Sequence, residues 1–198
     1  MGDGDAELVE RVRAGDPAAF ATLVRRYQPA LLRLAATVVP SRAVAEEAVQ
    51  DTWLGVVRGI ERFQGTSSFK TWLFRILVNR ARSAGAKERR TEALPDDDEP
   101  LAGRFERSGA WATPPVPWAE AAEDRVTAEQ LAKRVRECLA RLPAGQREVV
   151  LLHDVEALPP VEVCSVLGIK DGHRRVLLHR GRARVRQVLE TEMAGSER

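Results

Sequence analysis

The residues best suited to chemistry gather in one stretch, residues 45–82, where a polar loop separates two amphipathic segments. Phe63, Phe69 and Trp72 supply aromatic rings around the loop, and Asn79 supplies an amide further on. Basic side chains become frequent from this point onward, at Arg80, Arg82, Lys87, Arg89 and Arg90. Cations hold phosphates, while rings and amides hold an unstacked base, so this combination indicates contact with single-stranded nucleic acid.

Two helices must position these side chains. Residues 45–62 carry an apolar stripe at helical spacing, formed by Ala48, Thr52, Val56 and Ile60. Residues 68–82 carry a second one, formed by Trp72, Leu73, Ile76 and Leu77. Gly65 breaks the first helix, and Ser67 or Ser68 can cap the second. Periodicity alone favours a plain helical hairpin with a solvated polar face. The nucleic-acid interpretation therefore depends on the exact amino-acid sequence of the stretch.

The sequence AEEAVQDTWL, followed by RFQGTSSFKTWLFRILVNRAR, resembles region 2 of the extracytoplasmic-function (ECF) sigma factors of bacterial RNA polymerase. The resemblance spans both helices and the loop in order. It implies that the first helix docks on the polymerase core through Glu47, Gln50, Asp51, Leu54 and Arg58. It also implies that the loop and second helix take up a flipped base of the minus-10 element, through Phe63, Gln64, Ser67, Phe69, Lys70, Trp72, Asn79 and Arg80.

Length and composition fit an all-α protein with two small domains. The chain has 198 residues, enough for two such domains, and its hydrophobic share of 44% allows each to bury a core. Alternating β-branched patterns are nearly absent, whereas Ala, Leu, Arg and Glu dominate, which favours helix.

Before the central stretch, two further helices are expected. The first covers residues 6–14, and Gly15 ends it. Asp16 caps the next helix and Pro17 takes its first position. Pro29 falls inside this second helix and is expected to end or kink it, because proline lacks the amide hydrogen.

An acidic, proline-rich segment follows the basic stretch. Residues 91–124 hold nine carboxylates and two arginines, a net charge of −7 in a chain whose total is +2. Such a run cannot form a packed core, which predicts a flexible linker between two domains. Asp96, Asp97 and Asp98 lack the fixed geometry of a metal site. By the resemblance, the linker threads the polymerase, and Trp111 and Trp118 either anchor it there or are buried against a domain.

The C-terminal third has the pattern of a helix-turn-helix. Residues 131–142 carry an apolar stripe, residues 146–155 form a helix, and a short helix ends at Gly168. Ile169 is expected to pack into the core, and Asp171 is expected to cap a last basic helix. The apolar face of that helix is predicted to consist of Val176, Leu177, Leu178, Val185 and Val188. A short helix, a glycine turn and a longer helix are typical of a DNA-binding helix-turn-helix.

The wording LPAGQREVVLLHDVEAL, with EVCSVLGI and RRVLLHRGRARVR after it, looks like ECF sigma region 4. The start of the last helix departs from many relatives, which are rich in Ser and Thr there, so the bases read can differ. The residues expected to contact the minus-35 element are Lys170, His173, Arg174, Arg175, His179, Arg180 and Arg182. Early residues of the helix reach base edges, and later ones meet the phosphate backbone.

Other chemistry is not expected. Cys138 and Cys164 lack CxxC spacing and are interpreted as buried thiols in a reducing compartment. The three histidines are not at metal-ligand spacing with them, so neither a metal nor a cofactor is predicted. The acidic N-terminus does not resemble a signal peptide, and no apolar run is long enough to cross a membrane, which predicts a cytoplasmic protein without membrane insertion.

The chain is therefore interpreted as an ECF-type sigma factor that directs core polymerase to promoter DNA and promotes melting. The expected domains are region 2 at residues 5–90, the linker at 91–124 and region 4 at 125–192. An anti-sigma factor is an expected partner. The alternative is a stand-alone helix-turn-helix regulator, which leaves residues 62–79 without a role. An enzyme acting on nucleic acid would need a nucleophile–base pair or a metal cluster, and the sequence offers neither.

Overall fold

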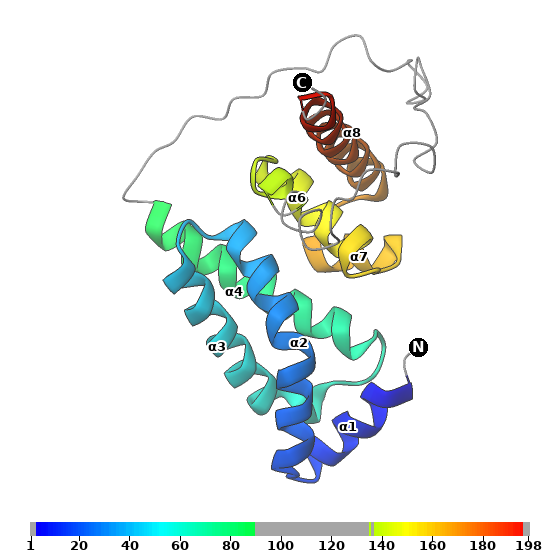
Figure 1. Cartoon of the computed structure of the whole chain (residues 1–198). Coiled ribbons are helices and arrows are strands. Elements are labelled where there is room, and N and C mark those ends of the chain that lie inside the picture. The colour runs from blue at the N-terminus through cyan, green and yellow to red at the C-terminus, as the bar shows by residue number, and fades with distance from the viewer. Residues whose placement is uncertain (1–2, 90–134, 136, 196–198) are drawn as a thin grey trace.

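The computed structural model describes residues 3–89, 135 and 137–195, and within them all regular secondary structure is helical. The helices form two groups (Figure 1). The N-terminal group consists of α1 (Asp3–Arg13), α2 (Pro17–Val38), α3 (Arg42–Gly59), the 3-10 turn η1 (Ile60–Arg62) and α4 (Phe69–Arg89). The C-terminal group consists of α6 (Ala144–Val150), the π-helical turn η3 (Leu151–Val155), α7 (Pro160–Leu167) and α8 (Asp171–Gly195). The acidic linker, with Trp111 and Trp118, lies outside the described residues.

The start of α2 confirms the predicted cap. The carboxylate of Asp16 accepts hydrogen bonds from the amides of Ala18, at 2.8 Å, and Ala19, at 3.2 Å. The expected break at Pro29 is wrong in one respect, because α2 continues to Val38. Ala30, Leu31, Leu34 and Ala35, directly after the proline, are buried, and this packing holds the chain helical despite the missing amide hydrogen.

The hairpin of α3 and α4 has the predicted form with shifted ends. Ser41 caps α3, and the Oγ atom of Ser68 accepts a hydrogen bond from the amide of Thr71, at 3.1 Å, in the first turn of α4. Gly65 in the loop has a φ of 69°, a left-handed conformation that glycine adopts without strain. Along α4, five side chains have no exposed area and form the centre of the N-terminal group: Leu73, Phe74, Leu77, Val78 and Ala81.

The C-terminal group confirms the helix-turn-helix. Gly168 ends α7 in the left-handed conformation, with a φ of 69°, and α8 begins three residues later. The helix predicted at 146–155 begins at Ala144 and widens into the π-helical turn η3 before Glu156. Cys138 is buried as expected, whereas Cys164 is half-buried.

The predicted apolar face of α8 is partly wrong. Val176 is 46% exposed, while Arg174, Leu178, Gly181 and Ala183 are buried. The buried stripe therefore starts at position 174 and continues at helical spacing through 178 and 181. Leu177 and Val185 are half-buried at its edge, and the side chain of Val188 lies outside the described ones.

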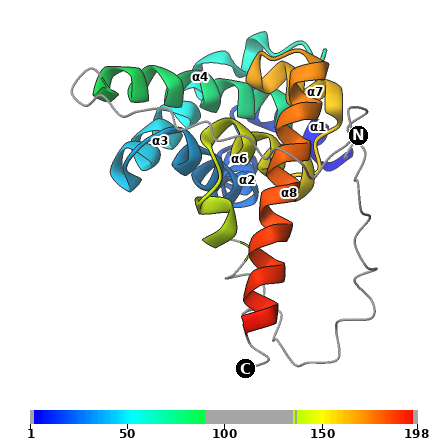
Figure 2. The same ribbon diagram turned by 90° about the horizontal axis from the view of Figure 1, so that it is seen from above.

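The two groups pack against each other. Buried apolar residues of both belong to one continuous cluster, which includes Leu77 of α4 and Val163 of α7. α7 lies along α4, and α6 lies against α2, whereas the far end of α8 projects away from the N-terminal group (Figure 2).

Gly181 permits the closest approach within the C-terminal group. A Cβ atom at this position would lie 2.7 Å from Cγ2 of Val150 and 3.3 Å from the carbonyl oxygen of Gln146. α8 can therefore pack on α6 only if position 181 has no side chain.

We expect Gly181→Ala to lower the melting temperature of the chain. Overpacking costs about 1–3 kcal/mol, which exceeds the gain of roughly 1 kcal/mol from alanine in a helix. Gly172→Ala in the same helix is the control, because a Cβ there meets open space, and it should leave the melting temperature unchanged or slightly raised. Thermal unfolding followed by circular dichroism measures both, and equal melting temperatures would contradict the close packing.

Candidate nucleic-acid interface

The outward face of α3 carries the residues predicted to bind polymerase. Glu47, Gln50, Leu54 and Arg58 are exposed, and Asp51 is half-exposed beside them. Their spacing of three, four and seven residues places them along one side of the helix. Leu54 is 52% exposed, and the neighbouring Val57, which the sequence did not single out, is 56% exposed. α3 thus presents an apolar centre with polar and charged residues around it.

The loop after α3 is supported by packed aromatic rings. The centroids of Phe63 and Trp72 lie 5.1 Å apart, and Phe69 lies 5.9 Å from Trp72 and 6.1 Å from Phe63. Phe69, one of the predicted minus-10 residues, is only 4% exposed, because its ring packs on Tyr27 and the core. Phe63 and Trp72 remain half-buried at the surface.

A hollow of about 530 Å³ lies between this loop and α1. One wall is the loop, with Phe63, Gln64, Gly65, Ser67, Ser68 and Phe69, and the other is α1, with Asp5, Ala6, Glu7, Val9, Glu10 and Arg13. Gln64 is exposed at its edge and Ser67 is half-buried. Sequence reasoning missed the contribution of α1, because a short amphipathic helix gives no signal of the loop that it will face.

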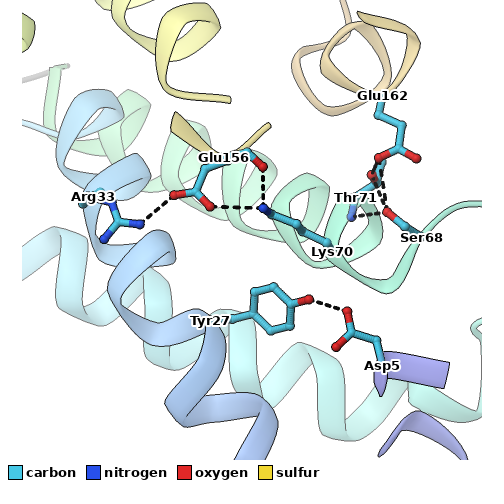
Figure 3. Close-up of polar contacts among 8 residues, drawn as sticks. All are labelled: Asp5, Tyr27, Arg33, Ser68, Lys70, Thr71, Glu156 and Glu162. Carbon is cyan, nitrogen blue, oxygen red and sulfur yellow. Dashed lines mark hydrogen bonds and ion pairs between the residues drawn. The ribbon is translucent and has the colours of Figure 1, made fainter. Parts of the chain in front are cut away.

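α1 also holds the loop and the side chain of Tyr27 in place. Nε of Arg13 donates to the carbonyl oxygen of Ile60, at 3.1 Å, and its Nη2 donates to the carbonyl oxygen of Phe63. The hydroxyl of Tyr27 donates to Asp5 (Figure 3). Burial raises the pKa of Tyr27, and the hydrogen bond to the Asp5 carboxylate raises that pKa further.

The predicted residues of α4 lie along its length. Asn79 and Arg80 are exposed, and Arg80 lies 3.8 Å from Asp51 of α3 in a loose ion pair. Asn79 is ten residues from Phe69, about 15 Å along the helix, and shares a face with Trp72. Lys70 is 26% exposed, and its amine donates to the carbonyl oxygen of Glu156, at 2.5 Å. The structure therefore does not bring all eight predicted minus-10 residues into one pocket.

The two arginines near the start of α8, Arg174 and Arg175, differ in their exposure to solvent. Arg174 is 6% exposed and forms an ion pair with Asp171, at 2.7 Å. Arg175 also contacts Asp171 but keeps 73% of its side chain exposed. Asp171, the predicted cap, is the first residue of α8, and the hydrogen bond from Arg174 holds the pKa of its carboxyl below the usual value. Arg175, and not Arg174, thus has the exposure that contact with base edges needs.

The other predicted residues of this helix-turn-helix are mostly exposed. Lys170, His173 and Arg180 are exposed, and His179 is half-buried. Nε of Arg182 donates to Asp154 of η3, at 2.9 Å, and this hydrogen bond raises the pKa of Arg182. Over the described part of the chain, no cluster of His, Cys, Asp and Glu could hold a metal ion. No helix there is both long and apolar enough to cross a membrane.

Comparison with known proteins agrees with the fold and the two helical groups. Residues 23–91 match the family described as Sigma-70 region 2, and residues 132–185 match Sigma-70, region 4. These two matches define the chain as a sigma-70-type transcription initiation factor. Proteins of this class initiate transcription and are not classical enzymes.

Similar proteins of known sequence narrow this class. The chain is 33% identical to the ECF RNA polymerase sigma-E factors of Salmonella typhimurium and Escherichia coli K12, over 90% of each chain. It is 29% identical to the RNA polymerase sigma-H factor of Pseudomonas aeruginosa, over 94% of each chain. The chain belongs to the ECF sigma factors, and a stand-alone regulator is excluded as its class.

Two solved structures share the fold. The structure of CnrH in complex with the cytosolic domain of CnrY superposes with a TM-score of 0.60 at 24% identity, covering 96% of this chain and 99% of that one. The sigma factor RpoE from Bartonella quintana, in complex with the anti-sigma factor NepR, also gives 0.60, at 23% identity, covering 86% and 96%.

We expect Arg13→Gln to loosen the loop at residues 63–68. The change removes charge-assisted hydrogen bonds to the carbonyl of Ile60, just before the loop, and to that of Phe63 at its start, each worth about 1.5–3 kcal/mol. Amide hydrogen exchange in the loop should therefore accelerate at least about tenfold. Arg11→Gln in the same helix is the control, because Arg11 makes only an exposed ion pair with Asp16. Unchanged loop exchange in Arg13→Gln would show that α1 does not hold the loop.

Proposed function

We propose that this chain binds core RNA polymerase through α3, reads the minus-10 element with the loop and α4, and reads the minus-35 element with α8. The corresponding domains are residues 5–90 and 125–192, joined by the acidic segment 91–124. The observation that carries this proposal is the α3–α4 hairpin. Its one side offers an exposed apolar centre, and its tip offers a hollow lined by aromatic and polar groups.

The α3 face has the composition of a protein-binding surface. Leu54 and Val57 form an exposed apolar pair, and Glu47, Gln50 and Arg58 surround it. Interfaces gain most of their binding energy from such anchors, while the polar rim excludes water and sets specificity. We propose that the polymerase core binds this surface. A protein without a binding partner would be expected to bury such an apolar pair, and membership of the sigma factors indicates which partner covers it.

The hollow at the loop suits a flipped base. The half-buried ring of Phe63, against which Trp72 packs, offers a stacking surface in the hollow, and Gln64 and Ser67 offer hydrogen-bonding groups. Flipping a base costs a few kcal/mol, which stacking and hydrogen bonds must offset. Asn79 and Arg80 lie further along α4, so we assign them to the adjoining nucleotides and phosphates of the non-template strand.

α8 is proposed to read the upstream element with its first turns. Arg175, which is largely exposed, is the residue we assign to base edges, where arginine discriminates guanine by about 1–3 kcal/mol. Lys170, His173, His179, Arg180 and Arg182 are assigned to the backbone, where contacts position the helix without specifying sequence. The burial of Arg174 favours a role in fixing the turn.

We also propose a cytoplasmic site of action, no catalytic activity of the chain alone, and regulation by an anti-sigma factor. CnrH was solved with the cytosolic domain of CnrY, and RpoE with the anti-sigma factor NepR, which supports an anti-sigma partner here.

The experiment that tests polymerase binding changes the apolar centre and its rim together. Leu54→Ala with Asp51→Arg should abolish co-purification with core polymerase, because the anchor is lost and a charge is reversed. The helical circular dichroism signal should stay intact, since Leu54 is 52% exposed and contributes little to the core. Glu137→Arg, which reverses an exposed charge in the C-terminal group, is the control and should keep full binding. Unchanged affinity of the double variant for core would refute the assignment of α3.

The role of Asn79 is tested on promoter melting. Asn79→Ala should impair opening of the duplex and relax base preference, because a hydrogen bond made only with the separated strand is lost. Ser83→Ala, one turn further along α4, controls for perturbation of the helix. Permanganate footprinting of the chain's own promoter measures melting, and normal reactivity with Asn79→Ala would mean that another residue reads the base.

A further inference from the structure

The hollow beside the loop has one wall that carries negative charge. Asp5, Glu7 and Glu10 of α1 line this wall, and Arg13 is the only cation among the described lining residues. Across the hollow lies the half-buried ring of Phe63. Phosphates are repelled by carboxylates, so this wall does not suit the DNA backbone. What it can hold is a group that donates hydrogen bonds, and bases carry such groups on their edges.

The carboxylates of this wall differ in what they can still bind. Both oxygens of Asp5 are in use, one with Arg26 and the other with the hydroxyl of Tyr27. Glu10 forms an ion pair with Arg13 through Oε1, at 2.5 Å, which leaves Oε2 available. The side chain of Glu10 is 68% exposed, so a base that enters the hollow can reach it.

Arg13 fixes Glu10 relative to the loop. Its Nη1 donates to Glu10, its Nη2 donates to the carbonyl oxygen of Phe63, and its Nε donates to that of Ile60, at 3.1 Å. One guanidinium therefore joins the carboxylate of α1 to the residue whose ring offers the stacking surface. Glu7 lines the same wall but forms no ion pair with the described residues that would orient it. Glu10 is thus the carboxylate that is held in place before a ligand arrives.

A carboxylate distinguishes bases by their exocyclic groups. An ionised glutamate accepts hydrogen bonds and cannot donate them. Cytosine, adenine and guanine each carry an exocyclic amino group, whereas thymine carries only oxygens and a methyl group. An amino group would donate to Oε2 of Glu10 in a charge-assisted hydrogen bond. A thymine oxygen in the same place would repel the carboxylate and leave it covered but unpaired, which is costly.

We propose that Glu10 is a specificity-determining residue of the hollow, and that it selects a flipped base with an exocyclic amino group over thymine. Arg13 is the positioning residue, because it acts through Glu10 and the loop. The proposal rests on the proposed function of the loop in taking up a flipped base, and it adds the class of base that is taken. Binding of thymine at this position should be weaker by roughly tenfold.

Selection of single-stranded DNA tests the proposal. The full-length chain, assembled with core RNA polymerase, is mixed with a short random-sequence DNA library, and the bound strands are sequenced. Thymine should be depleted roughly tenfold at the position of the flipped base. In an enriched strand, deoxyuridine in place of deoxycytidine at this position, or deoxyinosine in place of a purine, removes the amino group with little change in shape. This replacement should weaken binding by a similar factor.

Glu10→Gln identifies the residue that reads the amino group. The variant keeps the size of the side chain, and its amide both donates and accepts, so the two strands should bind within about twofold of each other. Glu61→Gln removes an exposed charge in η1 and is the matched control, which should keep the roughly tenfold difference. The ratio between the strands is unaffected by a general change in DNA affinity or by a looser loop, because both act on the two strands alike.

Each remaining outcome decides against one part of the account. Equal binding of the amino-bearing and amine-free strands by the wild-type chain would overturn the selection of the base. A difference that persists in Glu10→Gln, or that disappears in Glu61→Gln as well, would overturn the role of Glu10. If no strand is enriched although the chain binds core polymerase, the proposed function of the loop fails instead.

Discussion

Burial of α4 is the constraint on which the rest of the structure depends. Its inner face contributes Leu73, Phe74, Leu77, Val78 and Ala81, none of which has exposed area. Burying a leucine or phenylalanine side chain is worth about 1.5–3 kcal/mol, so this helix alone supplies a large part of the core. α2 and α3 cover one side of it, and α7 lies along another. The polar ridge of α4 with Asn79 and Arg80 stays exposed, whereas its first turn is largely buried and contacts the C-terminal group.

The arrangement explains why the loop can be both polar and ordered. A loop with glycine and three hydroxyl residues has little core of its own, yet the packed rings of Phe63, Phe69 and Trp72 support it from below. Arg13 holds two of the preceding carbonyls from the side. A site held in this way loses little conformational entropy when it binds a ligand, which favours affinity.

Local rules predicted much of this architecture from the sequence. Hydrophobic spacing placed both helices of the central hairpin, and the caps at Asp16 and Ser68 follow from side chains that accept hydrogen bonds from free amides. Gly168 marked the turn of the helix-turn-helix, because only glycine adopts its left-handed backbone freely. The residues proposed to bind polymerase lie along one side of α3 because of the same helical spacing.

Features that depend on distant contacts could not be predicted. Pro29 stays within α2 because the residues after it are buried, and Phe69 and Arg174 are buried by neighbours that the local sequence does not reveal. The π-helical turn η3, which leads to Glu156, has no sequence signal of its own. The contacts of Glu156 with Arg33 and Lys70 join positions far apart in the chain, and a single sequence contains no information that pairs them.

The central claim is that α3 binds the polymerase core while the loop after it and α4 meet the melted minus-10 element. A cryo-electron microscopy structure of the chain on core polymerase with a melted promoter tests this most directly. The account predicts that Leu54 and Val57 are buried against the core and that residues 63–68 and Asn79 face the non-template strand. A melted complex in which the α3 face lies away from the core, or in which residues 63–68 lie away from the non-template strand, would contradict it.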